Sequence, residues 1–338
     1  MKEIRDILKA YDIAKAESLE VALATVVKVE GSSYRHEGAR MLVDEEGQLT
    51  GAISGGCLEG DARKKALIAI SQRTKRVEIY DTREDANTDL GIQLGCNGIV
   101  HIIFEYIDPK DFNNPLELLR RSLQVRVGSV LATVFNPPKG TTSLMVGSES
   151  YFGDESLFPL LDSVQDTKVI DDSIVVVRQK PTIRLFIAGA GNDVLPLVNM
   201  AKVMGWEIFI GDGRPMLLTE KRFPGVDALY LGQAEQICSH ILWDEHTYVL
   251  LMSHNYFFDL QILRQALKNP CAYIGVLGPK SKLYRMEKDL GGLDERVHGP
   301  TGLDLGAETA EEIALSIISQ ILAFANGRKG GYLSENLC

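Results

Sequence analysis

The stretch RLFIAGAGNDV (residues 184–194) decides the fold of the second half of the chain. A short apolar run over residues 185–188 ends in a glycine-rich turn, and a helical pattern follows the turn. Glycines at such a junction allow a tight bend and let a phosphate approach the backbone amides at the start of the next helix. The order of strand, glycine turn and helix is typical of the first unit of a Rossmann fold.

The rest of this half repeats the same alternation. Helical stretches separate four more apolar runs and precede a long amphipathic segment: WEIFIGD (206–212), ALYLG (228–232), YVLLMS (248–253), AYIGVLG (272–278) and TAEEIALSIISQILAF (309–324). Short apolar strands alternating with helices favour right-handed βαβ units and a parallel sheet covered on both faces. The sequence therefore predicts a Rossmann-like, doubly wound parallel-sheet domain over residues 182–338.

A dinucleotide is one candidate ligand of this domain. Gly189, Gly191 and Asn192 form the turn after the first strand, and Asp212 ends the next strand, where a carboxylate would accept ribose hydroxyls. Arg214 could receive a 2′-phosphate, which keeps both NAD and NADP open. Val194 stands where the third glycine of the fingerprint is expected, so the alternative is a turn whose glycines only make the bend.

His254 is a candidate catalytic residue. It follows the predicted fourth strand at the carboxyl edge, where open α/β sheets bind ligands, and Asp259 lies within about a helical turn of it. His254 could act as an acid, a base or an anion contact, or it could be a surface or capping histidine. The other histidines show no metal-ligand spacing, and we predict no metal site.

In the first half of the chain, helices and strands do not alternate regularly as they do in the second half. An amphipathic helix over residues 3–17 precedes strand-like runs that include EVALATVVKV (20–29) and MLVDEEGQLTGAIS (41–54). We predict a mixed α/β domain over residues 1–108 and a connecting α/β segment over residues 109–181 that packs with it. SVLATVF (129–135) echoes VALATVV (21–27), but one short match is weak evidence for a repeat.

The motif GAISGGCLEG (51–60) holds a cysteine between two glycines and a helical pattern. The positive end of a helix dipole favours the thiolate of Cys57, and the amides of Gly55 and Gly56, next to Ser54, could bind an anion. Arg40 could add a fixed positive charge, and Cys96 lies in a second glycine-flanked loop. Taken singly, each cysteine is more often a small buried residue than a reactive one.

The composition and charge of the chain argue against several classes of protein. The net charge is −10, and no lysine- or arginine-rich run could neutralise a nucleic acid backbone. The five cysteines are scattered and never form a C-x-x-C pair, so neither a disulfide framework nor a zinc knuckle is indicated. The charged N-terminus has no apolar signal core, and no segment approaches a membrane span. We expect a cytoplasmic protein that binds neither nucleic acid nor membrane.

Eight strings together resemble the XdhC/CoxI family, the accessory proteins of xanthine dehydrogenase and related molybdenum hydroxylases. They follow the family order from about residue 20 to residue 320: EGSSYRHEGARMLV, GAISGGCLEGDA, LGIQLGCNG, FIAGAGNDV, GDGRP, MSHNYFFDL, YIGVLGPKSK and HGPTGLDLGAETAEEIALSI. The set is much more specific than any one motif.

The resemblance implies an N-terminal XdhC/CoxI-type domain and a C-terminal Rossmann domain. It also implies that the protein binds the molybdenum cofactor, protects it during sulfuration and delivers it to an apo-hydroxylase in purine catabolism. The implied partners are apo xanthine dehydrogenase or a related enzyme and a cysteine desulfurase, and a homo-oligomer is expected. On this view Cys57 contacts the cofactor or its sulfur, with Gly55 and Gly56 at its phosphate.

The chain also departs from the family pattern. Histidine often stands where this chain has Asn192, and glycine where it has Asn97, so ligand roles are not transferred directly to these two loops. Ala310 replaces a proline that commonly starts the last helix, which affects only helix initiation. Two other functions stay open: an NAD(P)-dependent oxidoreductase with His254 as proton donor, and a Rossmann domain without nucleotide that serves for dimerisation or docking.

Overall fold

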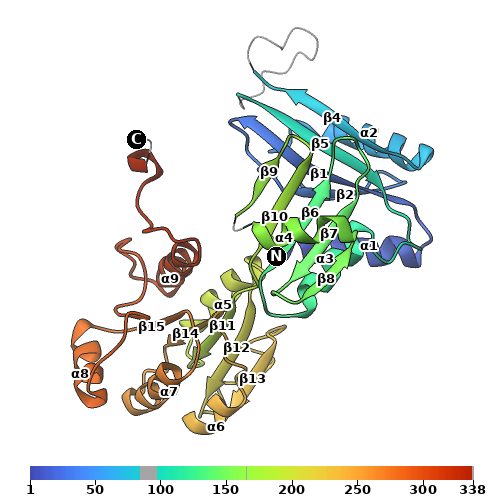
Figure 1. Ribbon diagram of the computed structural model, residues 1–338. Helices are drawn as coiled ribbons and strands as arrows, with labels where there is room; N and C mark the ends of the chain where they lie inside the picture. The colour runs from blue at the N-terminus through green and yellow to red at the C-terminus, as the bar shows by residue number, and fades with distance from the viewer. Residues whose placement is uncertain (84–96, 165, 337–338) are drawn as a thin grey trace. The chain divides into compact units, whose positions relative to one another are not determined.

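The computed structural model describes residues 1–83, 97–164 and 166–336, and the chain divides into two compact units, Met1–Pro181 and Thr182–Cys338 (Figure 1). Each unit has its own sheets and cores. The units are described separately below.

The second unit is a parallel six-stranded sheet. Its strands lie in the order β13-β12-β11-β14-β15-β16; they are β11 (Arg184–Ala188), β12 (Glu207–Asp212), β13 (Ala228–Leu231), β14 (Thr247–Leu251), β15 (Tyr273–Val276) and β16 (Val297–His298). The chain runs outward from β11 in one direction and then returns to β14 on the other side. The point where the strand order reverses therefore lies between β11 and β14, and open α/β sheets bind ligands at that point. The predicted Rossmann-like architecture is confirmed.

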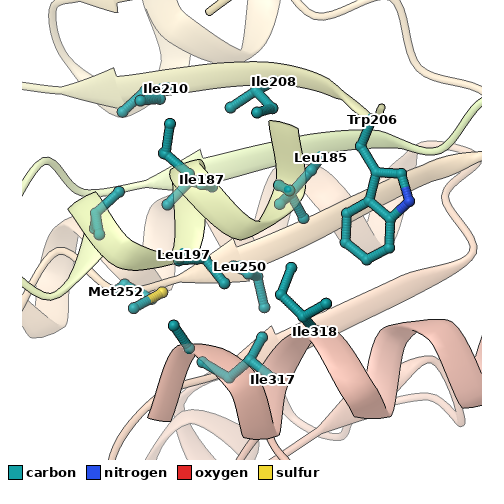
Figure 2. Close-up of a cluster of buried hydrophobic side chains, with 14 of the residues drawn as sticks. Leu185, Ile187, Leu197, Trp206, Ile208, Ile210, Leu250, Met252, Ile317 and Ile318 are labelled. Carbon is teal, nitrogen blue, oxygen red and sulfur yellow. The ribbon is translucent and has the colours of Figure 1, made fainter. Parts of the chain in front are cut away.

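Helices cover this sheet on two faces. The helices are α5 (Val194–Val203), α6 (Ala234–Ser239), α7 (Tyr256–Lys268), α8 (Lys280–Leu290) and α9 (Ala310–Ala325). One core joins the sheet to α5 and α9; in Figure 2, Ile317 and Ile318 of α9 point toward Leu185 and Leu250. A second core lies on the other face and includes residues of α6, α7 and α8. Thr309 and Glu312 form the capping box that starts α9.

The first unit contains two antiparallel sheets. Sheet A has the order β3-β2-β1-β5-β4 and is built from β1 (Val21–Gly31), β2 (Arg40–Asp44), β3 (Leu49–Gly51), β4 (Lys75–Asp81) and β5 (Gly98–Tyr106). Sheet B has the order β8-β7-β6-β10-β9 and is built from β6 (Ser129–Val134), β7 (Thr142–Val146), β8 (Ser150–Gly153), β9 (Lys168–Ile170) and β10 (Ile174–Gln179).

The two sheets have the same topology. Counting along the chain, β1 to β5 correspond one by one to β6 to β10, and the helices follow the same scheme. The first repeat has α1 (Lys2–Ala16) before β1 and α2 (Glu59–Gln72) before β4, whereas the second has α3 (Pro115–Gln124) before β6 and η2 (Glu155–Leu157) with α4 (Phe158–Ser163) before β9. The first unit therefore consists of two structurally equivalent repeats.

Backbone details support this equivalence. Leu23 pairs with Leu42 in sheet A, and Leu131 pairs with Leu144 in sheet B. The segment that follows the first strand of each repeat returns to an equivalent residue: Gly38 N donates to Val26 O, within β1, at 2.9 Å, and Gly140 N donates to Val134 O, at the end of β6, at 3.0 Å. Both sheets contribute to two shared cores. The echo between VALATVV and SVLATVF thus marks equivalent strands.

Candidate functional site

The loop of residues 52–58 connects β3 to α2 and carries the first candidate site. The Ser54 hydroxyl organises this loop, because Ser54 Oγ accepts hydrogen bonds from Gly56 N and Leu58 N, both at 3.1 Å. α2 begins at Glu59, so Cys57 lies just before the helix. Ser54 thus fixes the amides of the loop that lead into α2, whose N-cap residue Leu58 has no side-chain cap of its own.

The Glu59 side chain folds back into the same loop. Its carboxylate accepts Ser54 N at 2.9 Å and Leu58 N at 3.2 Å, and it also accepts the Ser54 hydroxyl. A carboxylate of the chain itself thus lies in the loop that carries Gly55 and Gly56, bonded to the amides of Ser54 and Leu58 on either side of them. Glu59 is the first residue of α2, and its return to Ser54 depends on the conformation of the loop, so spacing alone does not predict it.

Cys57 differs from the buried cysteines of the described residues. Its side chain is half-buried and packs at the edge of the core between sheet A and α2. Cys238 and Cys271 are buried in the second unit. Burial raises the pKa of both thiols, that of Cys238 to about 12, so neither ionises readily. Partial exposure singles out Cys57 as the accessible thiol in this comparison.

An aromatic ring lies beside the Cys57 loop. A Cβ placed on Gly55 would be 3.4 Å from Tyr34 Cγ and 3.5 Å from Tyr34 Cδ1, which is ordinary van der Waals contact, so this ring lies beside Gly55. Tyr34 itself is 70% exposed. Gly56 has a φ of +112°, and no described atom lies within 4 Å of where its Cβ would be. Sequence reasoning missed Tyr34, because its proximity to Gly55 arises only in the fold.

Two other predicted residues do not join this site. Arg40 pairs with Thr25 in sheet A and lies on the same face as Leu42, whereas Met41 and Cys57 belong to the core on the α2 face. Arg40 is buried, and desolvation lowers its pKa to about 10. The expected positive charge beside Cys57 is therefore corrected: it lies on the opposite face of sheet A. Cys96 lies outside the described residues.

The glycine turn of the second unit is shaped by close packing. Gly189 has a φ of +127°, and a Cβ there would lie 2.5 Å from Met252 O and 2.7 Å from Ser253 N. Only glycine allows the ends of β11 and β14 to approach this closely. The turn is also tied to its surroundings, since Arg222 donates to Asn192 Oδ1 at 2.8 Å and to Ala190 O at 2.8 Å.

The Asp212 carboxylate is engaged inside the fold. Its Oδ2 accepts Ala190 N at 2.7 Å, and Arg214 donates to both of its oxygens, from Nε at 2.9 Å and Nη2 at 2.7 Å. Burial raises the pKa of Asp212, but the bonds from Arg214 and Ala190 outweigh burial and hold the pKa below its ordinary value. The two residues predicted to bind ribose and 2′-phosphate thus bind each other and close the turn.

His254 lies at the point where the strand order reverses, between the ends of β11 and β14. Its Nε2 lies 2.8 Å from Asp193 Oδ2, so a residue after β14 contacts a residue after β11. The imidazole is 62% exposed, and the backbone φ of His254 is +58°. Such a conformation is uncommon for histidine and is found preferentially at functional sites. The structure therefore places His254 at the ligand-binding edge, with Asp193 as its partner.

Asp259 has another role than its spacing from His254 suggested. It is fully buried; its carboxylate accepts Ser253 Oγ at 2.6 Å and Lys282 Nζ at 2.8 Å. This ion pair connects the start of α7 to α8 and braces the loop that carries His254. Among the described residues, no cluster of three or more histidine, cysteine or acidic side chains could hold a metal ion.

In the described parts of the chain, no helix is long and apolar enough to cross a membrane.

Two known protein families match this chain, one in each unit. The XdhC Rossmann domain matches residues 185–321, and the XdhC and CoxI family matches residues 14–81. The first match covers the second unit almost completely. The other begins at the end of α1 and covers β1 to β4 of sheet A, the Cys57 loop and α2.

Individual relatives match along nearly the whole chain. A Bacillus subtilis protein named as a probable xanthine dehydrogenase subunit is 31% identical, over 90% of this chain and 92% of that protein. The molybdenum cofactor insertion chaperone PaoD from Escherichia coli is 24% identical, over 88% of this chain and 81% of PaoD. A crystal structure described as a xanthine dehydrogenase from Bacillus halodurans has a TM-score of 0.83 and 26% identity, and covers 98% of this chain and 100% of its own. The chain therefore belongs to the XdhC/CoxI family.

Proposed function

We propose that this protein binds the molybdenum cofactor and delivers it to xanthine dehydrogenase or a related molybdenum hydroxylase. The observation that carries the proposal is the similarity, along 88% of the chain, to a protein named as a molybdenum cofactor insertion chaperone. The similarity to a probable xanthine dehydrogenase subunit supports the choice of target. The protein acts in this proposal as an accessory protein and not as an enzyme with turnover.

The Cys57 loop is the proposed contact with the cofactor. Its thiol is accessible, and the space beside Gly56 is open. The Glu59 carboxylate already accepts two amides of this loop and would repel a phosphate there. We therefore place Cys57 at the molybdenum–sulfur end of the cofactor, and not Gly55 and Gly56 at its phosphate. The cofactor supplies the metal and the terminal sulfur; the loop supplies a soft thiol ligand.

The partners follow from this role. The protein would receive sulfurated cofactor through a cysteine desulfurase and would release the cofactor to the apo-hydroxylase. It would work in the cytoplasm, as a homo-oligomer. These partners, the location and the assembly are parts of the proposal.

A transfer experiment tests delivery. The protein, purified with cofactor from a cofactor-competent host, is mixed anaerobically with apo xanthine dehydrogenase, and urate formation is followed. We expect activity to rise with the amount of cofactor-loaded protein. The same protein from a host unable to make the cofactor serves as control and is expected to give no rise. Equal activity with both preparations would contradict delivery.

An NAD(P)-dependent oxidoreductase remains the second candidate, favoured by the Asp193–His254 pair at the reversal of the strand order. The internal pairing of Asp212 with Arg214 weighs against it, because a ribose would have to displace the guanidinium. Saturable NAD(P)H binding that is lost in Asp212→Ala would support this candidate. Unchanged thermal melting with NAD(P), ATP and molybdopterin would instead support a docking platform, since a ligand of the native state raises its stability.

A further inference from the structure

Comparison of the two repeats of the first unit shows what the first repeat adds to the shared scaffold. β1 runs from Val21 to Gly31, whereas its counterpart β6 runs only from Ser129 to Val134. Residues 52–58 separate β3 from α2, whereas Asp154 alone separates β8 from η2. The second repeat thus keeps the sheet without these additions. The longer β1 leads into the loop that carries Tyr34, and the other addition is the Cys57 loop.

The two additions meet at one place. The Tyr34 ring lies beside Gly55, with its Cγ, Cδ1 and Cδ2 atoms at 3.4, 3.5 and 3.8 Å from the position that a Gly55 Cβ would have. Three ring atoms at such similar distances place the face of the ring, and not its edge, over the glycine.

The other face of the ring is available to a ligand. Tyr34 is 70% exposed although it has Gly55 on one side, and an exposed tyrosine offers a large apolar face with a polar hydroxyl at its tip. The neighbouring Gly56 has open space within 4 Å of its Cβ position, as far as the described residues extend. An aromatic platform and an accessible thiol therefore share one rim of the first unit.

We propose that Tyr34 is the stacking platform for the fused heterocycle of the ligand whose metal end contacts Cys57. The inference rests on the proposed function, because it identifies the ligand as a pterin. The planar pyrimidine ring of a pterin can stack on the face of a tyrosine ring in an offset arrangement. Tyr34 would be a positioning residue that orients the pterin so that the opposite end of the cofactor reaches the thiol. No covalent step is involved.

Retention of the cofactor by Tyr34 variants tests this inference. Wild type, Tyr34→Phe, Tyr34→Trp and Tyr34→Leu are purified from a cofactor-competent host, and pterin and molybdenum per protein are measured. We expect Tyr34→Phe and Tyr34→Trp to retain the cofactor, and Tyr34→Leu to lose roughly three- to tenfold of it, as the usual strength of an aromatic pair predicts. Tyr284→Leu changes a tyrosine of similar exposure, 66%, in the second unit and is expected to have no effect.

The outcomes separate the two proposals. Wild type without pterin would contradict the proposed function itself. Wild type with pterin and equal pterin in Tyr34→Leu would overturn only the role of Tyr34. Equal loss in the Phe, Trp and Leu variants would show that the hydroxyl and not the ring face is required, and would also overturn it. Thermal melting of each variant checks that it is folded. A Tyr34→Trp variant that retains the cofactor would show in addition that a substitution at this position does not disrupt the loop.

Discussion

Replacing Gly189 with alanine is expected to destabilise the second unit by about 3 to 5 kcal/mol. The alanine Cβ would lie 2.5 Å from Met252 O and 2.6 Å from Met252 C, which are backbone atoms at the end of β14 and cannot rotate away. Alanine would also have to adopt a φ of +127°. Strain and overlap therefore add, and β11 and β14 would have to separate at the point where the strand order reverses.

Gly292→Ala is the matched control. Gly292 has a φ of +136°, yet no described atom lies within 4 Å of its Cβ position, so this variant carries the strain without the overlap. Both tryptophans, Trp206 and Trp243, lie in the second unit, and urea denaturation followed by their fluorescence reports its unfolding. We expect a loss of about 1 to 2 kcal/mol for the control. Equal losses in both variants would contradict the close packing of the turn.

Replacing Glu105 with glutamine is expected to stabilise the first unit at alkaline pH. Glu105 is 1% exposed, on the face of sheet A that includes the paired residue Leu23. Burial raises its pKa from the ordinary 4.5 to about 7, although Lys75, 3.5 Å away, and Arg40 both lower it. An ionised Glu105 is therefore costly inside the fold. Glutamine has nearly the shape of the protonated acid and avoids this cost.

The sign of the pH dependence follows from the two pKa values. The unfolded chain releases the Glu105 proton near pH 4.5, whereas the folded chain holds it up to about pH 7. The free energy of unfolding of wild type thus falls between these values and stays lower above them. At pH 8 we expect Glu105→Gln to be more stable by about 3 kcal/mol, and near pH 4 to equal wild type. Urea denaturation followed by far-UV circular dichroism measures both; an unchanged or lower stability at pH 8 would contradict the raised pKa.

Much of the second unit could be predicted from the sequence. Its five longer strands are apolar runs that end in glycine or small polar residues, and the helices between them have clear periodicity. β16 was not predicted, because Val297 and His298 are too short a run to show any pattern. The strand forms because the chain returns beside β15, where Val297 pairs with Ile274. That pairing is a tertiary event.

The repeat in the first unit could hardly be predicted. Only the stretch Leu-Ala-Thr-Val is shared between β1 and β6, and the remaining strands keep their apolar pattern without keeping their residues. Topology is preserved because each sheet needs only an apolar face toward the shared cores, which many residue combinations provide. The equivalence emerges from strand order and from the bonds of Gly38 and Gly140.

The candidate sites were predicted as positions but not as contacts. Cys57 and His254 lie where the motifs placed them, because strand ends and helix starts are local features. Their partners Tyr34 and Asp193 come from other loops, and no spacing connects them. The charges of Arg40 and Asp212 were assigned to ligands, yet the fold engages both inside the protein. Whether a charge faces a ligand or a neighbour is decided by tertiary packing.

Binding of the cofactor at Cys57 is tested by the molybdenum and pterin content of the purified protein and of its Cys57→Ala variant. Both are isolated anaerobically from a cofactor-competent host, with thermal melting as a check of folding. We expect both components in wild type, in equal amounts, and at least about a tenfold lower content in Cys57→Ala because one ligand to the metal end is lost. Absence of cofactor from wild type, or equal content in the two proteins, would contradict binding at Cys57.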